Sequence, residues 1–213
     1  MSNGLKVVRG PKRSRIATIQ PTKLKLIETA SELIETLGIN NLTSEKVLEQ
    51  SGVSRGSLYH HFEDFSDLLE QALVRKFAAL VDINVAAMTA LFNESTSRED
   101  LFAGLHILAS DIHSLKNNSN RYFRARIIAL AETNERLLRQ LSVEQTRLNA
   151  ALTELFAGCQ RKGWMNRDFN PATAAIFVQA YTLGQVINHI SSDRVSDEQW
   201  SAMVDDVLQK LFG

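Results

Sequence analysis

Residues 43–62 read TSEKVLEQSGVSRGSLYHHF, and they carry the strongest structural signal in the chain. Two short helix-length segments are joined there by Ser51-Gly52-Val53-Ser54. Gly52 tolerates the positive φ of a tight turn, and Ser54 can cap a helix that begins after it. A short helix, a glycine turn and a second short helix are typical of a helix-turn-helix, which places its second helix in the DNA major groove.

The composition indicates a globular protein of one large domain or two smaller ones, with 213 residues of which 44% are hydrophobic. No run of about twenty apolar residues suggests a membrane span, and the basic N-terminus lacks the apolar core of a secretory signal. The single cysteine, Cys159, excludes an internal disulfide framework and fits the reducing cytoplasm. Cys159 is interpreted as a small buried residue, with a redox sensor as the alternative.

The net charge is zero, but the basic residues gather at the N-terminus. We expect residues 1–21 to form a basic flexible arm. This arm is either a solvated tail or a segment that binds phosphates or the minor groove, with Arg13 and Arg15 as candidate contacts. Both interpretations hold if the arm becomes ordered only when it binds DNA. The basic residues before the first acidic residue, Glu28, are Lys6, Arg9, Lys12, Arg13, Arg15, Lys23 and Lys25.

The chain after residue 21 follows helical periodicity throughout, which predicts an all-α fold of about nine helices. Thr22 is expected to cap the first helix and Gly38 to end it. A fourth helix of unusual length is expected from Asp64 toward Phe92. The remaining expected helices span 43–51, 54–61, 98–116, 119–132, Asn134 to a stop at Gly163, Pro171 to 190 behind an Asn170 cap, and a last helix behind a Ser196–Gln199 capping box.

The segment 171–190 has almost no polar face, so it must be buried on all sides. It is either the central helix of a single chain or a helix that packs on the core and on a second, symmetry-related copy. Small residues would allow close helix approach in such a homodimer. The candidate dimer-interface residues are Ala180, Gly184, Ile187, Trp200, Val204 and Val207.

The block from residue 22 to 75 resembles the TetR family of bacterial transcriptional regulators. The resemblance is carried by Thr43, Leu48, Gly52-Val53-Ser54, Gly56, Leu58-Tyr59, His61-Phe62 and Leu68-Leu69. The later chain is similar only loosely, through Gly163, Asp168, Pro171, Ala174-Ala175 and Gly184. The resemblance implies an N-terminal three-helix DNA-binding domain and a larger C-terminal helical domain that binds an effector and dimerises.

The resemblance also implies roles for single residues. Arg55, in the first turn of the recognition helix, would reach a guanine edge or a phosphate. Gly56 would let the backbone approach DNA. Two positions depart from the family pattern: Phe65 stands where a phosphate-binding lysine is common, and Glu49 where alanine is usual. The candidate DNA-binding residues are Thr43, Ser54, Arg55, Gly56, Ser57, Tyr59 and His60, with Arg13 and Arg15 of the arm.

An effector pocket is expected in the C-terminal domain, concave and mostly apolar. Ordinary core packing is the alternative for each aromatic residue. No cofactor and no metal site are expected, because the sequence lacks metal-ligand spacing, a phosphate-binding glycine loop and a nucleophile elbow. The candidate pocket residues are Phe102, His106, Phe123, Ile127, Phe156, Trp164, Phe177 and Tyr181.

The sequence therefore predicts a homodimeric transcriptional regulator of the cytoplasm, a repressor that a small molecule releases from a pseudo-palindromic double-stranded DNA operator. The alternative is an all-helical carrier or enzyme in which the helix-turn-helix is only structural. The expected domains are residues 1–21, the arm; 22–67, the DNA-binding domain; and 68–213, the effector-binding and dimerisation domain.

Overall fold

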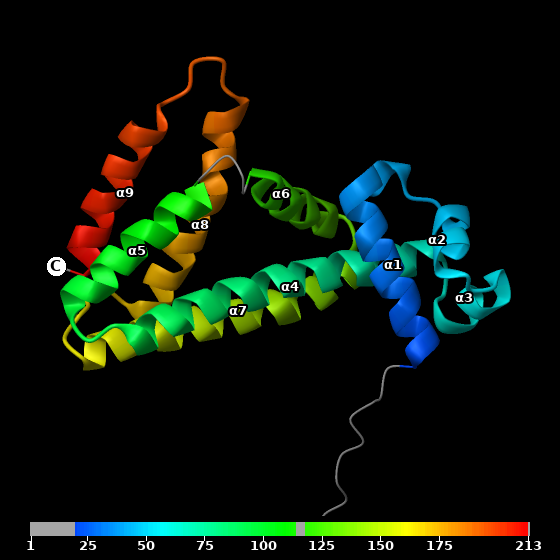
Figure 1. Cartoon of the computed structure of the whole chain (residues 1–213), viewed down its shortest axis with the longest axis horizontal. Helices are drawn as coiled ribbons and strands as arrows, with labels where there is room; N and C mark the ends of the chain where they lie inside the picture. The colour runs from blue at the N-terminus through cyan, green and yellow to red at the C-terminus, as the bar shows by residue number, and fades with distance from the viewer. Residues whose placement is uncertain (1–19, 114–117, 213) are drawn as a thin grey trace, which may run out of the picture. The chain divides into compact units, whose positions relative to one another are not determined.

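A computed structural model describes residues 20–113 and 118–212 of the chain. Within these ranges the backbone forms nine α-helices and one short 3₁₀ helix, without a strand (Figure 1). The expected all-α class is confirmed. The chain divides into two compact units between Leu68 and Leu69.

The first unit is built from short helices around one small apolar core. Leu26, Val47 and Leu58 are fully buried, and Phe62 closes the core with its ring beneath the Lys23 ammonium at 5.2 Å. Lys23 can cover Phe62 in this way because its charge is attracted to the ring face. The elements of this unit are α1 (Pro21–Leu37), η1 (Ile39–Asn41), α2 (Ser44–Ser51) and α3 (Arg55–His61).

The start of α1 differs from the sequence prediction. Gln20 is the N-cap and makes no side-chain cap, while Pro21 occupies the first helical turn. The expected cap at Thr22 is wrong, because proline lacks an N–H and has the φ of a helix, so the cap and the helix start lie two residues earlier. Gly38 ends α1 at φ 79°, as expected.

The turn between α2 and α3 has the predicted chemistry. Gly52 adopts the left-handed conformation at φ 65°, and its N–H donates to the Leu48 carbonyl at 2.9 Å. The Thr43 hydroxyl accepts from the Lys46 N–H at 3.4 Å at the start of α2. The Ser54 hydroxyl accepts from the Ser57 N–H at 3.2 Å at the start of α3. Two capped helices and a left-handed glycine thus set the angle of the helix-turn-helix.

The second unit consists of long helices that pack side by side. Helices α4 and α7 run alongside each other (Figure 1). Arg147 Nη1 of α7 donates a hydrogen bond to Asp82 Oδ1 of α4 at 2.6 Å. Helix α8 packs on α6 and α7, and α5 packs on α8 and α9. The helices are α4 (Phe65–Glu94), α5 (Arg98–His113), α6 (Asn118–Glu132), α7 (Glu135–Arg161), α8 (Pro171–Ile190) and α9 (Asp197–Phe212).

Most predicted helix boundaries of this unit are confirmed, while the end predicted at residue 116 lies outside the described residues. Asn134 caps α7, and Asn170 caps α8 with Pro171 in the first turn. Ser196 and Gln199 form a reciprocal capping box at 3.2 Å in both directions. Gly163 follows the end of α7 at φ 74°. Local side-chain chemistry therefore sets these boundaries.

A buried carboxylate joins α4 to α7. Glu70 is only 5% exposed and accepts from Arg136 Nε at 2.5 Å and Nη2 at 2.9 Å. Asn134 Nδ2 donates to the same carboxylate at 2.8 Å. This bidentate pair satisfies a charge that would be costly to bury alone.

Candidate nucleic-acid interface and effector region

The N-terminal half of α3 lies at the surface of the first unit. Ser54, Arg55 and Gly56 are exposed, and Tyr59 keeps 52% of its surface accessible. The opposite side of the helix packs inward through Leu58, which is fully buried. Thr43 and His60 are also exposed, while Ser57 is half-buried with its hydroxyl 3.0 Å from that of Ser54. The seven candidate contacts of this unit are thus set on the two helices of the turn.

Arg55 has an intramolecular partner. Its Nη2 lies 2.8 Å from Oε1 of Glu45 on α2, and both side chains are more than half exposed. The pKa of Glu45 is lowered by its backbone hydrogen bond, then by Ser44, with a smaller contribution from Arg55. An exposed pair of this kind contributes little to stability, so Arg55 can exchange Glu45 for a DNA group at little cost.

Gly56 has open space around it. A methyl group added at its Cα would meet only the Ser54 hydroxyl, at 4.0 Å. A glycine inside a helix costs about 0.5–1 kcal/mol relative to alanine. Since the fold has room for alanine, packing within the chain does not account for this glycine.

The start of α4 uses its acidic residues for capping. The Asp64 carboxylate accepts from the Asp67 N–H at 2.7 Å, and the Asp67 carboxylate accepts from the Glu63 N–H at 3.2 Å. Phe65 is the first residue of α4 and is half-buried. The sequence from Glu63 to Asp67 contains no lysine or arginine, which is the departure noted above.

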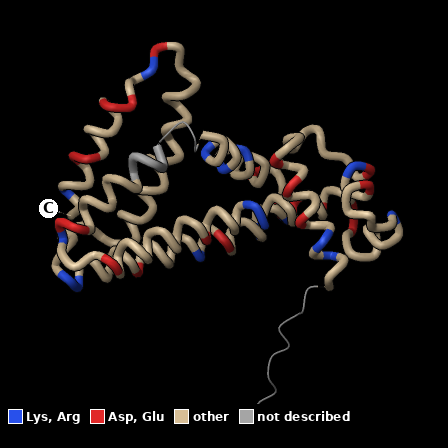
Figure 2. The backbone as a smooth tube through the Cα atoms, in the orientation of Figure 1, with Lys and Arg blue, Asp and Glu red and all other residues tan. Residues whose placement is uncertain are grey.

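The described part of the first unit, residues 20–68, is acidic overall. Between residues 20 and 68 there are eight acidic and four basic residues. In Figure 2 the red acidic positions outnumber the blue basic ones along α1 and α2. Arg13 and Arg15, the predicted arm contacts, lie outside the described residues.

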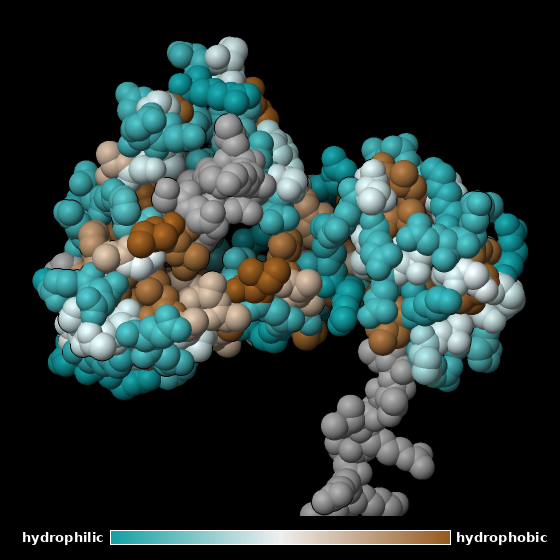
Figure 3. Space-filling view, viewed as in Figure 1, coloured by the Kyte–Doolittle hydropathy of each residue, from teal (hydrophilic) through white to brown (hydrophobic). Residues whose placement is uncertain are grey.

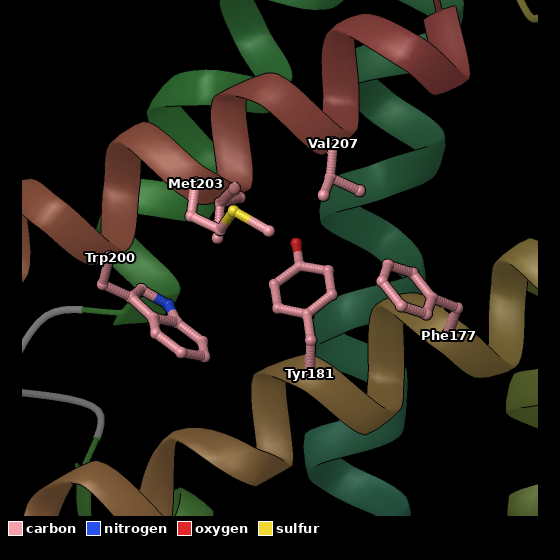
Figure 4. Close-up of a pocket in the computed structure, with 6 residues that line it drawn as sticks. Phe177, Tyr181, Trp200, Met203 and Val207 are labelled. Carbon is pink, nitrogen blue, oxygen red and sulfur yellow. The ribbon is translucent and has the colours of Figure 1, made fainter.

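The eight candidate pocket residues do not line one cavity. Phe177 and Tyr181 of α8 line a cavity of about 230 Å³ with Trp200, Met203, Val204 and Val207 of α9 (Figure 4). Phe102 lines a second cavity of about 450 Å³ between α5 and the end of α9. His106 is exposed, with Nδ1 2.6 Å from Asp205.

The other four candidates are packing residues. Phe156 is buried against Phe212 at a centroid distance of 5.9 Å. Trp164 stacks edge-on to Phe92 at 6.1 Å, beneath the Lys162 ammonium. Phe123 and Ile127 are buried on α6. Helical spacing places aromatics on a core-facing side, but it does not specify which cavity they reach.

Helices α8 and α9 expose a broad apolar face. Ile187 and Ile190 of α8 are 73% and 72% exposed, and Met203 of α9 is 63% exposed. A central core helix would bury these side chains, so the single-chain alternative for residues 171–190 does not fit. Among the predicted interface residues, Ala180 and Ile187 are exposed, Gly184, Trp200 and Val207 are half-buried, and Val204 is buried.

The inward side of the same region carries polar groups that sequence reasoning missed. Gln185 and His189 of α8 are buried, as is Arg121 of α6. The His189 Nδ1–H donates to Asn118 Oδ1 at 2.8 Å. Arg124 of α6 is half-buried, with its Nε shielded from solvent. The apolar character of 171–190 already predicted burial of Gln185 and His189, whereas the arginines of α6 pattern like a solvated face, so the sequence carried no signal for their burial.

Residues 20–113 and 118–212 lack two further features. No helix there is both long and apolar enough to cross a bilayer. No cluster of three or more potential metal ligands occurs among the same residues.

Comparisons with known proteins agree for both units. Residues 26–72 match the family model of bacterial regulatory proteins of the tetR family, and residues 123–213 match that of the BetI-type transcriptional repressor C-terminal domain. The chain is 20% identical to the HTH-type transcriptional regulator UidR of Escherichia coli K12, covering 89% of this chain and 94% of UidR. It is 24% identical to an acrEF/envCD operon repressor of Escherichia coli K12, covering 90% of each.

Solved structures show the same fold. A TetR-family transcriptional regulator from Mesorhizobium loti superposes with a TM-score of 0.66 at 21% identity, covering 88% of this chain and 93% of that one. Reduced NemR of Escherichia coli superposes with a TM-score of 0.63 at 17% identity, covering 90% of this chain and 97% of that one.

The two family models together span more than half of the sequence, and each covers one of the two structural units. Regulators of this kind bind operator DNA as homodimers and respond to small molecules, which favours the regulator prediction over the carrier or enzyme. The chain belongs to the TetR family of bacterial transcriptional regulators.

Proposed function

We propose that this chain represses transcription by placing α3 in the major groove of an operator, and that a small molecule bound by the second unit releases it. The main support is the exposed side of α3, from which Arg55 and Tyr59 project and whose start is capped by Ser54. Gly56 beside them leaves room for a close backbone approach. Such a protein works in the cytoplasm, beside the chromosome, and needs no catalytic residues.

Specific contacts follow from the exposed groups of the turn. Arg55 would leave Glu45 and donate to a guanine edge or a phosphate. Thr43, Ser54 and Ser57 would donate hydroxyl hydrogen bonds to phosphates near helix N-termini, where the backbone N–H groups favour anions. Tyr59 and His60 would reach phosphates or bases one turn later.

The experiment is a mobility shift of the gene's own upstream region with purified protein. Arg55→Ala and Tyr59→Ala should each weaken binding by about 1–3 kcal/mol, roughly 5- to 150-fold. Arg139→Ala is the matched control, because Arg139 is also exposed and pairs with a helix carboxylate, Glu135, at 3.3 Å. Unshifted DNA at low salt, or equal losses for Arg139→Ala and Arg55→Ala, would refute the proposed reading surface.

The basic arm would supply phosphate contacts that the acidic residues 20–68 lack. Each phosphate contact adds roughly one unit to the slope of log affinity against log salt. Replacing Arg13 and Arg15 together by alanine should therefore lower this slope by about two units. An unchanged slope would remove the arm from the binding mechanism.

The exposed face of α8 and α9 would be the homodimer interface. Phe177 and Tyr181, predicted for the effector pocket, share their cavity with Trp200 and Val207 of this face (Figure 4), so we assign them to the dimer. Ile187→Glu should yield a monomer in sedimentation, because a carboxylate would be buried at the two-fold contact. Ile83→Glu, which alters another exposed isoleucine (65%) on α4, should leave the dimer intact.

A further inference from the structure

Arg124 on α6 has no counter-charge within the described structure. Its Nε is shielded from solvent without a hydrogen-bond partner, and no ion pair joins its guanidinium to another described residue. Burial lowers the pKa of Arg124, and no carboxylate opposes that effect. The group nevertheless stays charged, because an arginine is not deprotonated in proteins.

Other arginines of this unit are compensated. Arg136 meets the Glu70 carboxylate, and Arg147 meets Asp82 and Glu144. The pKa of Arg147 is accordingly raised, first by its hydrogen bond to Glu144. Arg121, one turn from Arg124, has its lowered pKa partly restored by Asp197. Arg124 therefore differs from these neighbours in having only an aromatic ring to face.

That ring is Phe77 of α4, whose centroid lies 5.8 Å from the Arg124 guanidinium carbon. Phe77 is 1% exposed, and Ile127, one turn along α6, is fully buried. A cation–π contact offsets only part of the desolvation of a buried charge. The ring contacts the face of the guanidinium, so the N–H donors in the guanidinium plane remain available. Their geometry matches the oxygens of a carboxylate or a phosphate.

The second unit is hollowed beside helix α6. The space-filling view in Figure 3 is hollowed in the part of the second unit that α4, α6 and α8 surround in Figure 1. Helix α6 also packs on α7 and α8, so a group bound at Arg124 would touch the helices of the unit's interior.

We propose that the Arg124 guanidinium binds the anionic head group, a carboxylate or a phosphate, of the small molecule to which this regulator responds. The proposal rests on the effector response proposed above. The Phe77 ring packs against one face of the guanidinium. The apolar part of the organic anion lies against the buried side chains of α4 and α6.

The test is calorimetric titration of the full-length protein, without DNA, with octanoate, octyl phosphate and the neutral octanamide. Benzoate and benzamide form a second pair with an aromatic body. At least one anion should bind about tenfold or more tightly than its amide, since charge-assisted hydrogen bonds are the stronger ones. The octanoate and octyl phosphate arms then identify the head group. Equal affinities of every anion and amide would overturn the proposal.

Two substitutions with the same change in charge localise the effect. Arg124→Met should bind the anion and its amide with about equal affinity. Arg126→Met, on an exposed position of α6, should keep the preference for the anion. Arg124→Met should also melt at or above the wild-type temperature, because it removes an uncompensated charge. A lower melting temperature, or the same loss in Arg126→Met, would make Arg124 a structural residue and overturn the assignment.

The mobility shift keeps this proposal separate from the regulator function. Without ligand, Arg124→Met should bind the upstream DNA as the wild type does. Failure of the wild type to bind any DNA would refute the proposed function, whereas the anion preference is decided by calorimetry alone.

Discussion

Helices α3 and α6 differ in the solvent exposure of their polar residues. On α3, Arg55 and Tyr59 point to solvent while Leu58 forms the core. On α6, Arg121 is buried and Arg124 half-buried, whereas the apolar Ile128 and Leu130 are 42% and 41% exposed. The polar side chains of α3 are therefore available to a partner outside the fold, such as DNA. The inner side of α6 carries charge that must be compensated within the fold or by something bound there.

This difference separates two ways of building a functional surface. In the first unit the apolar core is complete without the candidate DNA contacts, so those contacts can be changed at little cost to stability. In the second unit polar groups such as Glu70 and His189 lie inside the packing. Substitutions there should alter stability and function together.

The largest expected effect comes from the core of the first unit. Leu58→Ala should destabilise this unit by about 2–5 kcal/mol, because Leu58 is fully buried and a cavity would remain. DNA binding should be lost while the second unit still melts cooperatively in calorimetry. Leu138→Ala, at a 50% exposed position of α7, should change neither. A single shared transition that shifts as a whole would show that the units are not independent.

Glu70→Gln should come next, with a loss of about 2 kcal/mol, because it removes the charge that Arg136 and Asn134 contact. The measurement is urea unfolding of the second unit. Glu135→Gln removes the exposed partner of Arg139 and should cost less than about 0.5 kcal/mol. Equal effects of the two changes would contradict the contrast between buried and exposed charges.

A pair of helical glycines sharpens the comparison further. Gly56→Ala should stabilise the first unit by about 0.5–1 kcal/mol yet weaken DNA binding, because alanine suits the helix but crowds the DNA. Gly104→Ala should instead destabilise the second unit by about 1 kcal/mol, since its methyl group would lie 2.1 Å from Leu91 Cδ1. Thermal melts and mobility shifts check both. A Gly56→Ala variant with undiminished DNA affinity would refute the proposed close approach of the Gly56 backbone to DNA.

The smallest effect concerns pH. Burial, followed by the charges of Arg121 and Arg194, lowers the pKa of His189 below its ordinary 6.5. The folded chain therefore binds this proton less readily than the unfolded chain. Stability from neutral His189 is complete above about pH 6.5 and is lost as pH falls through the lower folded pKa.

Melting curves from about pH 7.5 to 5 test this linkage. The wild type should lose more stability on acidification than His189→Gln, whereas His60→Gln, on the exposed surface of α3, should follow the wild type. Identical pH profiles for all three proteins would remove His189 as a contributor.

The sequence by itself determined the helix-turn-helix, most helix ends and the all-α class. These features depend on residues that act locally: the left-handed Gly52, the caps at Thr43, Ser54, Asn134 and Asn170, and the Ser196–Gln199 box. Only tertiary structure decided that the aromatic pocket candidates separate among several sites, that Arg55 meets Glu45, and that Arg124 lacks a counter-charge among the residues the structure describes. Helical periodicity gives the face of each residue, but the partner of that face depends on which distant helix packs against it.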